Sequence, residues 1–332
     1  MRDIRWEGIG ISMICCISLL LSASTSFPTR LEGKLAFTRR VGDTEQICVM
    51  DWSGTRIIYK STFNPGEGIG SLSWSPDGEY IAFDVITKGA TRIFIISSRG
   101  GTPRELRIEK EGYEFKSFYN PDWSPKGDEI AFVGVFKVKG GARREIFTVK
   151  AEGGEAKEIT HDRVTPGIGY LSWAPDGKRI AFDRGSWEEW NQDLFIVDTI
   201  SGHVERLTQT RNISEQKPSF SPDGRRIAYV TQDLPDKIFI LDLETSVHNE
   251  ISLPSDVDVR NSTITWSGDG SRIIFDSRDL YLYDLKAGSL RSVVRSSAIE
   301  QNPDWWTGYT LVKPLDLLST MWSLIKIKAG KQ

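Results

Sequence analysis

The sequence predicts an all-β fold: a six-bladed β-propeller of four-stranded antiparallel blades, in which a C-terminal strand completes the N-terminal blade. Three observations predict this fold. One hairpin motif recurs, its copies follow one another at intervals of 49, 50, 47 and 46 residues, and the two chain ends supply the strands of one further blade. Intervals of that length are typical of propeller blades. No amphipathic helix of useful length separates the strand patterns, which argues against the α/β classes.

The recurring motif is an aromatic residue, a Ser-Pro-Asp-Gly type turn and an Ile-Ala-Phe type strand. Its first copy is Trp74-Ser75-Pro76-Asp77-Gly78 followed by Ile81-Ala82-Phe83, and in every copy the second aromatic comes nine positions after the first. These turn residues fit a type I turn, in which Pro fixes φ and Gly takes the left-handed region. The two aromatics therefore lie on adjacent antiparallel strands. We expect the first aromatics to be structural anchors of the core: Trp74, Trp123, Trp173, Phe220, Trp266 and Trp305.

Each motif is followed by the patterns of a third and a fourth strand. The third strand is apolar, as in Ile93–Ile96, and a turn such as Arg99–Gly101 leads to a charged fourth strand such as Arg104–Leu106. Charged outer strands discourage edge-to-edge pairing between molecules.

The sixth blade is divided between the two ends of the chain. Residues 34–60 supply three strand patterns with no anchor aromatic before them, and Asn302–Trp305 supplies the missing innermost strand. Asn120–Trp123 is the same tetrapeptide inside an intact blade. Pairing of the two ends closes the ring and removes an exposed sheet edge.

These segments resemble the WSPDG repeats of TolB-type, WD40-like propellers, and they cover the chain from about Leu31 to Trp306. The resemblance implies a periplasmic or secreted six-bladed propeller that acts as an interaction platform. Such blades also occur in peptidase propellers, so the motif indicates the fold more strongly than the function.

The N-terminal segment has the features of a secretory signal peptide. Arg2 and Arg5 precede an apolar run from Ile9 to Leu21, which is followed by the small residues 22–26. The run is shorter than the roughly 20 apolar residues that span a bilayer. We expect a signal peptide at 1–26, a propeller at 31–306 and a tail at 307–332, with a periplasmic or secreted location. An uncleaved membrane anchor is the alternative.

The C-terminal tail lies outside the repeats. Leu318, Met321, Trp322 and Ile325 have helical spacing, which predicts a short amphipathic helix docked on the propeller. Because lysines lie nearby, association with a membrane surface is the alternative. We therefore expect membrane association only through an uncleaved signal or through this tail.

Composition and motifs argue against several functions. Lys+Arg total 42 and Asp+Glu total 45, so no basic field favours nucleic acid as a partner. His161 is predicted on one face of the ring and His203 and His248 on the other, so we expect no metal site and no other cofactor. The sequence has no Gly-x-Ser-x-Gly motif of a serine hydrolase.

The loops between the second and third strands vary in length, whereas the hairpins do not. Variable loops on a rigid scaffold commonly carry binding. These loops share a face with the segments that enter the innermost strands, so the mouth of the central channel on that face is the predicted binding site. Its predicted residues are Tyr119, Asn120, Tyr170, Trp187, Trp190, Gln216, Lys217, Arg260, Asn261 and Gln301.

We therefore predict a noncatalytic scaffold that binds a protein or peptide, or a carbohydrate, at the channel mouth. The alternative is a propeller enzyme, a glycan lyase or hydrolase that acts at the same face. In that case Asp162, Glu188 or Glu215 would serve as acid or base.

Overall fold

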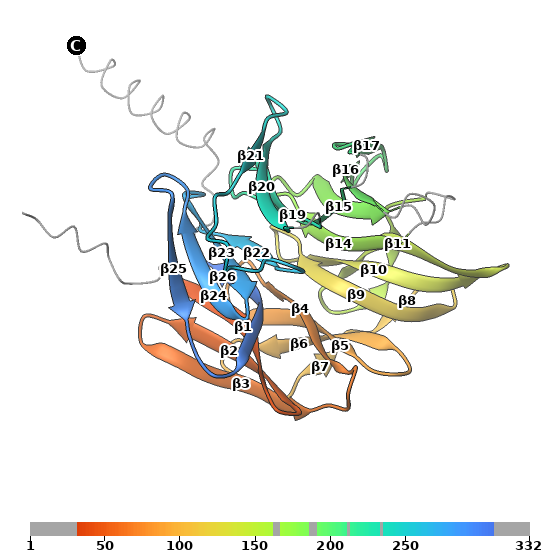
Figure 1. Ribbon diagram of the computed structural model, residues 1–332. Coiled ribbons are helices and arrows are strands. Elements are labelled where there is room, and N and C mark those ends of the chain that lie inside the picture. Colours follow the sequence, from red (N-terminus) through yellow and green to blue (C-terminus); the bar gives the residue numbers. More distant parts are fainter. Residues whose placement is uncertain (1–31, 162–166, 186–190, 211–212, 233–234, 309–332) are drawn as a thin grey trace, which may run out of the picture.

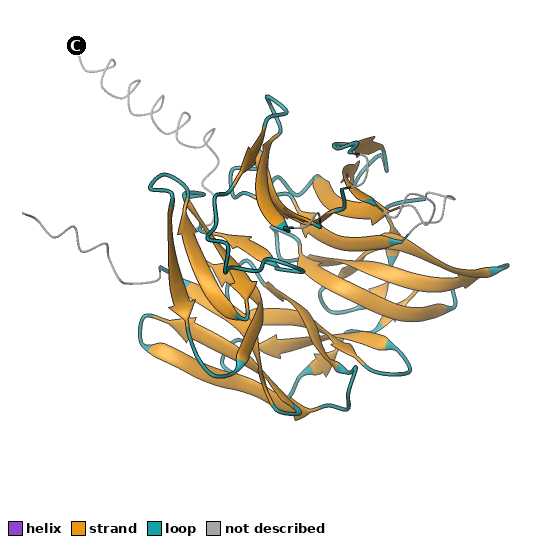
Figure 2. Cartoon of the chain, in the orientation of Figure 1, coloured by secondary structure: helices purple, strands orange, loops and turns teal. Residues whose placement is uncertain are grey.

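The computed structural model describes residues 32–161, 167–185, 191–210, 213–232 and 235–308, and they form six four-stranded sheets. Figure 1 shows these sheets arranged as the blades of a propeller. The regular elements of the described residues are all strands (Figure 2). The predicted fold class is confirmed. No helix among the described residues is long and apolar enough to cross a membrane.

The first blade joins the two ends of the described chain. From the channel outward its strands are β26 (Ile299–Trp306), β1 (Lys34–Val41), β2 (Thr44–Asp51) and β3 (Gly54–Thr62). Lys34 pairs with Trp306 and Leu35 with Trp305 in antiparallel register, and Figure 1 shows blue β26 beside red β1. The Trp305 indole N–H also donates to the Glu32 carbonyl at 2.7 Å. The predicted closure by the C-terminal strand is confirmed.

The other five blades each use consecutive strands. The second has β4 (Gly68–Trp74), β5 (Tyr80–Ile86), β6 (Thr91–Ser97) and β7 (Arg104–Glu105). The third has β9 (Phe115–Trp123), β10 (Glu129–Val138), β11 (Gly141–Lys150) and β13 (Lys157–Glu158). The fourth has β14 (Ile168–Trp173), β15 (Arg179–Gly185), β16 (Gln192–Asp198) and β17 (Val204–Arg206). The fifth has β18 (Glu215–Phe220), β19 (Arg226–Thr231), β20 (Lys237–Asp242) and β21 (His248–Glu250). The sixth has β22 (Ile264–Trp266), β23 (Arg272–Ser277), β24 (Asp279–Asp284) and β25 (Ser289–Val294).

One further pairing was not predicted. The short strand β8 (Ile108–Glu109) runs parallel to β12 (Gly154–Glu155), which links the rim of the second blade to that of the third. His248 begins β21 in the fifth blade. Its ring nitrogen lies 2.7 Å from the Tyr229 hydroxyl.

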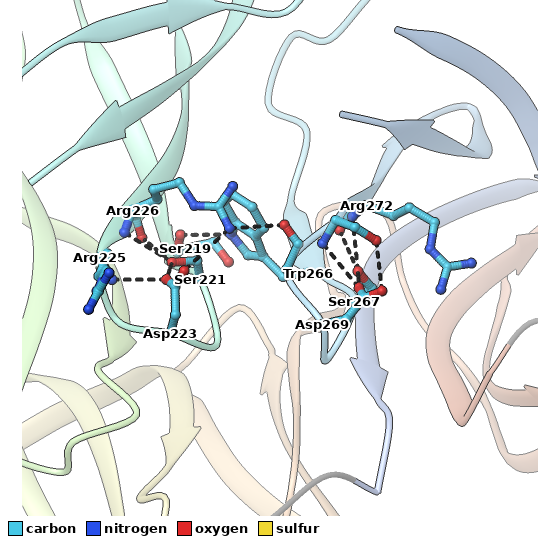
Figure 3. Close-up of polar contacts among 11 residues, drawn as sticks. Ser219, Ser221, Asp223, Arg225, Arg226, Trp266, Ser267, Asp269 and Arg272 are labelled. Atoms are coloured by element: carbon cyan, nitrogen blue, oxygen red, sulfur yellow. Dashed lines mark hydrogen bonds and ion pairs between the residues drawn. The ribbon is translucent and has the colours of Figure 1, made fainter. Parts of the chain in front are cut away.

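The hairpin motif folds as its residue types predict. In the first copy the Gly78 amide donates to the Ser75 carbonyl at 2.9 Å, and the Ser75 hydroxyl donates to Asp77 at 2.5 Å. Gly78 has a φ of 71°, in the left-handed region that the turn requires. Figure 3 shows two later copies, in which Ser221 bonds Asp223 and Ser267 bonds Asp269 in the same way.

Neighbouring blades are joined by a basic residue at the start of the second strand. The Arg226 guanidinium donates to the Gly270 carbonyl at 3.0 Å and lies 4.9 Å from the centre of the Trp266 ring (Figure 3). Arg179 contacts the fifth blade in the same manner. Each such contact combines a hydrogen bond with a cation–π interaction on the next anchor.

The core lies between the sheets. The second-strand aromatics are fully buried, whereas the short outer strands carry exposed charged residues, as in β7 and β21. The buried second-strand aromatics are Phe37, Phe83, Phe132, Phe182 and Phe275. This division matches the alternation of apolar and charged strands in the sequence.

We expect Trp305→Ala to lower the free energy of unfolding by about 3 to 5 kcal/mol, because it removes a buried aromatic and the bond that closes the ring. Denaturant titration followed by tryptophan fluorescence and circular dichroism measures the loss. Ile200→Ala is the control, since that side chain is 78% exposed and its loss should change the free energy by less than about 0.5 kcal/mol. Equal effects of the two changes would contradict the closure described here.

Candidate functional site

A central channel is lined by the innermost strands, and the residue before each anchor faces it. These six residues, which we call the pre-anchor ring, are Ser73, Asp122, Ser172, Ser219, Thr265 and Asp304. Five of them accept a hydrogen bond from the anchor amide of the next blade. Asp122, for example, accepts from the Trp173 amide at 2.6 Å. The ring therefore ties five of the six pairs of neighbouring inner strands together.

A second set of contacts uses a buried aspartate in alternate blades. These three residues, which we call the bridging aspartates, directly follow the second-strand aromatic: Asp84, Asp183 and Asp276. Asp183 accepts from the Tyr170 amide of its own blade at 2.9 Å and from the Lys217 amide of the next blade at 3.1 Å. The other two bind the equivalent amides of their own and the next blade. The blades are thus joined in three pairs at the channel entrance.

The bridging aspartates explain two near-identical glycine segments. A Cβ added to Gly70 would lie 2.4 Å from the Asp84 carboxylate, and one added to Gly169 would lie 2.1 Å from that of Asp183. Neither glycine has a positive φ. Their role is therefore to allow close approach of the carboxylate rather than an unusual backbone conformation.

The next blade supplies a strained residue opposite each bridging aspartate. Asn120, Lys217 and Asn302 have φ values between 51° and 54°, and each precedes a proline. A positive φ is costly for a residue with a side chain. The hydrogen bond from each of these amides to a buried carboxylate offsets that cost.

The channel opens on two faces with different chemistry. We call the face where the chain enters the innermost strands the entry face, and the face of the Ser-Pro-Asp-Gly turns the hairpin face. The entry side holds a cavity of about 110 Å³, lined among others by Ser71, Asn120, Tyr170, Lys217 and Thr263. Polar side chains of five blades therefore converge on a narrow opening.

Lys217 is the cationic side chain of this cavity lining. Its ammonium lies 4.4 Å from the centre of the Tyr170 ring and donates to the Asn261 carbonyl. The side chain is buried, and its charge is compensated by Asp183 and Asp276, whose pKa values it lowers. Lys217 therefore fixes the geometry of the opening.

The predicted mouth residues fall into three groups. Asn120, Tyr170 and Lys217 line the entry cavity, and Gln216 and Asn261 are joined beside it by the Gln232 amide. Farther out lie three residues: Tyr119 beneath the Arg144 guanidinium, Arg260 paired with Asp236, and exposed Gln301. Trp187 and Trp190 lie outside the described residues.

The hairpin face holds a larger cavity that the sequence analysis did not predict. It measures about 490 Å³ and is lined by the anchors together with Trp306 and the turn prolines. The anchors are largely buried, so each contributes little exposed surface to this cavity. The sequence analysis explained the aromatic anchors by core packing alone. In the structure the same side chains also form part of the cavity wall.

Five buried carboxyls of the channel region have raised pKa values. Burial raises the pKa of Asp84 and of Asp122 to about 7, and the pKa values of Asp183, Asp276 and Asp304 to about 6. The nearby Asp304 carboxyl adds to the rise at Asp122. Their hydrogen bonds act in the opposite direction but do not overcome burial.

The candidate acids of the enzyme alternative are only partly described. Asp162 and Glu188 lie outside the described residues, whereas Glu215 is buried at the start of β18. Burial raises the Glu215 pKa, while the Thr208 and Thr210 hydroxyls lower it. Among the described residues no group of three or more His, Cys, Asp or Glu side chains is arranged to hold a metal.

Comparisons with known proteins support the fold. No protein-family model matches the chain. TolB from Acinetobacter baumannii superposes with a TM-score of 0.65 at 21% identity, over 82% of this chain and 66% of that one. A putative TolB from Agrobacterium tumefaciens gives 0.60 at 19% identity, over 82% and 91%. The chain therefore has a TolB-like six-bladed propeller fold, as the repeats indicated.

Curated relatives match over shorter stretches. Dipeptidyl-peptidase 5 from Porphyromonas gingivalis is 26% identical over 146 residues, which cover 39% of this chain and 21% of the relative. The Tol-Pal system protein TolB from Francisella tularensis is 31% identical over 85 residues, 25% of this chain and 19% of the relative. This chain thus spans about a fifth of the length of these relatives, one of which is named as a peptidase and the other as a Tol-Pal protein.

We expect Gly169→Ala to destabilise the fold by more than about 1 kcal/mol, because the new methyl group displaces the Asp183 carboxylate from the two amides that it binds. Gly89→Ala is the matched control, since nothing lies within 4 Å of the added Cβ and its φ is not positive. Thermal melts of both variants measure the difference. Similar melting temperatures would rule out the steric role assigned to Gly169.

The raised carboxyl pKa values predict how stability depends on pH. Because the folded chain holds these protons more tightly than the unfolded chain, their stabilising contribution is complete below about pH 4 and is lost as pH rises through 6 to 7. Urea unfolding should therefore give a larger free energy at pH 5 than at pH 8, by about 1 kcal/mol or more. Asp84→Asn should reduce this difference. A wild-type free energy that rises between pH 5 and pH 8 would contradict the assignment.

Proposed function

We propose that this TolB-like propeller is a noncatalytic binding module of the periplasm or cell exterior, which holds a protein or peptide partner on its entry face. The observation that carries the proposal is the polar opening at that face. Most of its side chains come from inner strands that the bridging aspartates fix in pairs. Side chains held in place before binding lose little conformational freedom on binding, which favours affinity.

The dimensions of the opening favour a macromolecular partner. Pockets that enclose small molecules commonly measure about 300 to 1,000 Å³. The entry cavity, at about 110 Å³, accommodates one side chain of a partner whose remaining contacts spread over the surrounding surface. Beyond the cavity lining, Tyr119, Gln216 and Gln301 provide a partly exposed aromatic ring and two amide side chains. Such amphipathic and adaptable groups are typical of protein-recognition surfaces.

The periplasmic or exterior location rests on the predicted signal peptide at 1–26, which lies outside the described residues. Two comparisons also support it, since TolB structures match the fold and the matching relative from Francisella tularensis is named as a Tol-Pal system protein. The proposed site differs from the aromatic hairpin-face cavity, so the two faces can be tested separately.

We expect a photo-crosslinking amino acid at Tyr119 to capture a discrete partner in native envelope or secreted fractions. The matched control is the same amino acid at Tyr80, an aromatic that is 47% exposed beside the hairpin turns. Mass spectrometry identifies the adduct, and an excess of unlabelled wild-type protein should suppress it.

Equal capture at the two positions, or capture at Tyr80 alone, would contradict an entry-face site. Cleavage of a glycan or a peptide by the purified chain, abolished by Glu215→Gln, would favour the enzyme alternative instead. Binding on a glycan array without a protein adduct would identify a carbohydrate as the partner and overturn the proposal of a protein.

A further inference from the structure

Thr210 lies at the centre of a polar cluster between the fourth and fifth blades, on the entry face. Its amide donates to Asp193 Oδ1 at 3.4 Å, and its carbonyl accepts from Asn191 Nδ2 at 2.8 Å. The Thr208 and Thr210 hydroxyls lie beside the Glu215 carboxylate. Side chains from the start of β16, from the segment after β17 and from the start of β18 therefore meet at one residue. We call Asn191, Asp193, Thr210 and Glu215 the Thr210 cluster.

Three oxygen atoms of this cluster are buried without a hydrogen bond. They are Glu215 Oε2, Asn191 Oδ1 and Thr210 Oγ1, and none meets hydrogen-bond geometry with a partner in the described part of the chain, although the Thr210 hydroxyl lies close enough to Glu215 to lower its pKa. Glu215 is 2% exposed and Asn191 is 5% exposed, so bulk water does not reach these side chains freely. Buried acceptors without a partner are destabilising, and a native structure commonly meets them with an ion or a bound water.

The repeat provides an internal comparison for Glu215. Glu300 occupies the same position, five residues before the anchor of its blade, and is fully buried. Its Oε1 receives Arg39 Nε at 3.0 Å and the Ser296 hydroxyl at 2.7 Å, although its Oε2 is also unbonded. The charge of Glu300 is therefore compensated by a guanidinium.

Glu215 has no such ion pair among the described residues. The Arg206 guanidinium, whose charge lowers the Glu215 pKa, forms its ion pair with the Asp193 carboxylate and donates to the Thr208 carbonyl. No ion pair therefore compensates the Glu215 carboxylate within the described part of the chain. Buried carboxylates in this situation are paired, protonated or bound to a metal.

We propose that the Thr210 cluster binds a divalent cation of the calcium type. Glu215 Oε2, Asn191 Oδ1, Thr210 Oγ1 and the Asp193 carboxylate are the protein ligands, and water completes the coordination. This inference goes beyond the binding function proposed above and does not depend on it.

The chemistry of the ligands selects the class of metal. All four donors are oxygen atoms, which suit hard cations, whereas zinc and copper sites favour nitrogen and sulfur. The donors mix carboxylate, amide and hydroxyl groups from three separate segments. Calcium tolerates such irregular sets of six to eight oxygens better than magnesium does, which requires near-ideal octahedral geometry.

The expected calcium affinity of the Thr210 cluster follows from the charge of its ligands. Because Arg206 already neutralises part of the Asp193 charge, we expect binding in the range of about 10⁻⁴ to 10⁻³ M that extracellular calcium modules show. The ion would join the fourth blade to the fifth at the entry face, two residues from Lys217 in the channel lining.

The test uses the full chain after treatment with a chelator. Calcium chloride at 5 mM should raise the melting temperature of the wild-type protein by a few °C, with magnesium giving a smaller shift. Glu215→Gln should abolish the calcium shift. Glu300→Gln is the matched control and should keep it, whatever its effect on the melting temperature without calcium.

Equilibrium dialysis with radioactive calcium provides a second measurement, and its wild-type arm does not depend on the folding of a variant. The wild-type chain should bind about one ion, and Thr210→Val, which exchanges the hydroxyl for a methyl group, should weaken binding at least about tenfold. Absence of saturable calcium binding by the wild type would overturn the proposal. It would equally fail if Glu215→Gln raised the melting temperature and left the calcium shift unchanged, because Glu215 would then be a protonated hydrogen-bonding group.

Discussion

Hydrogen bonds from the amides of inner strands to buried side-chain oxygens, most of them in a neighbouring blade, are the interaction on which the rest of this propeller depends. Blades pack face to face through apolar side chains, which resist separation but do little to define the angle between one blade and the next. The pre-anchor ring and the bridging aspartates define it, because each accepts amides whose positions are set by the strand backbone. Burying a carboxylate is costly, but a buried polar network of this kind favours one arrangement over its alternatives.

The alternation of these contacts gives the two faces of the channel different properties. Bridging aspartates occur in the second, fourth and sixth blades, and each fixes the entry segments of two blades. The entry face therefore presents a rigid polar opening surrounded by variable loops. The hairpin face is built from the repeated turn and the aromatic anchors. Its cavity is therefore lined largely by residues that also stabilise the core. The loops that vary between blades thus lie on the entry face, and the repeated turns lie on the hairpin face.

Much of this fold could be predicted from the sequence because its signals are local. The nine-residue spacing of the aromatics specifies a hairpin, and the shared Asn-Pro-Asp-Trp segment identifies the strand that closes the ring. The bridging aspartates were missed, although Phe83-Asp84, Phe182-Asp183 and Phe275-Asp276 make an alternating pattern visible in the repeats. Their partners lie in another blade, as with Asp183 and Lys217, which are 34 residues apart. The Thr210 cluster was missed for the same reason: Glu215 was considered only as a possible acid or base, and its neighbours come from other segments that meet it only in the assembled blades.

Hydrogen exchange measured by mass spectrometry tests most directly whether a bridging aspartate fixes the entry face. Asp183→Asn should be compared with the wild type at pH 8, where the wild-type carboxyl is ionised. The account predicts faster exchange in two segments from different blades, 168–171 and 216–219, whose amides at Tyr170 and Lys217 bind this carboxylate. Exchange of the equivalent segment 69–72, which Asp84 holds, should not change. Unchanged exchange in both affected segments, or an increase spread evenly over all blades, would contradict the account.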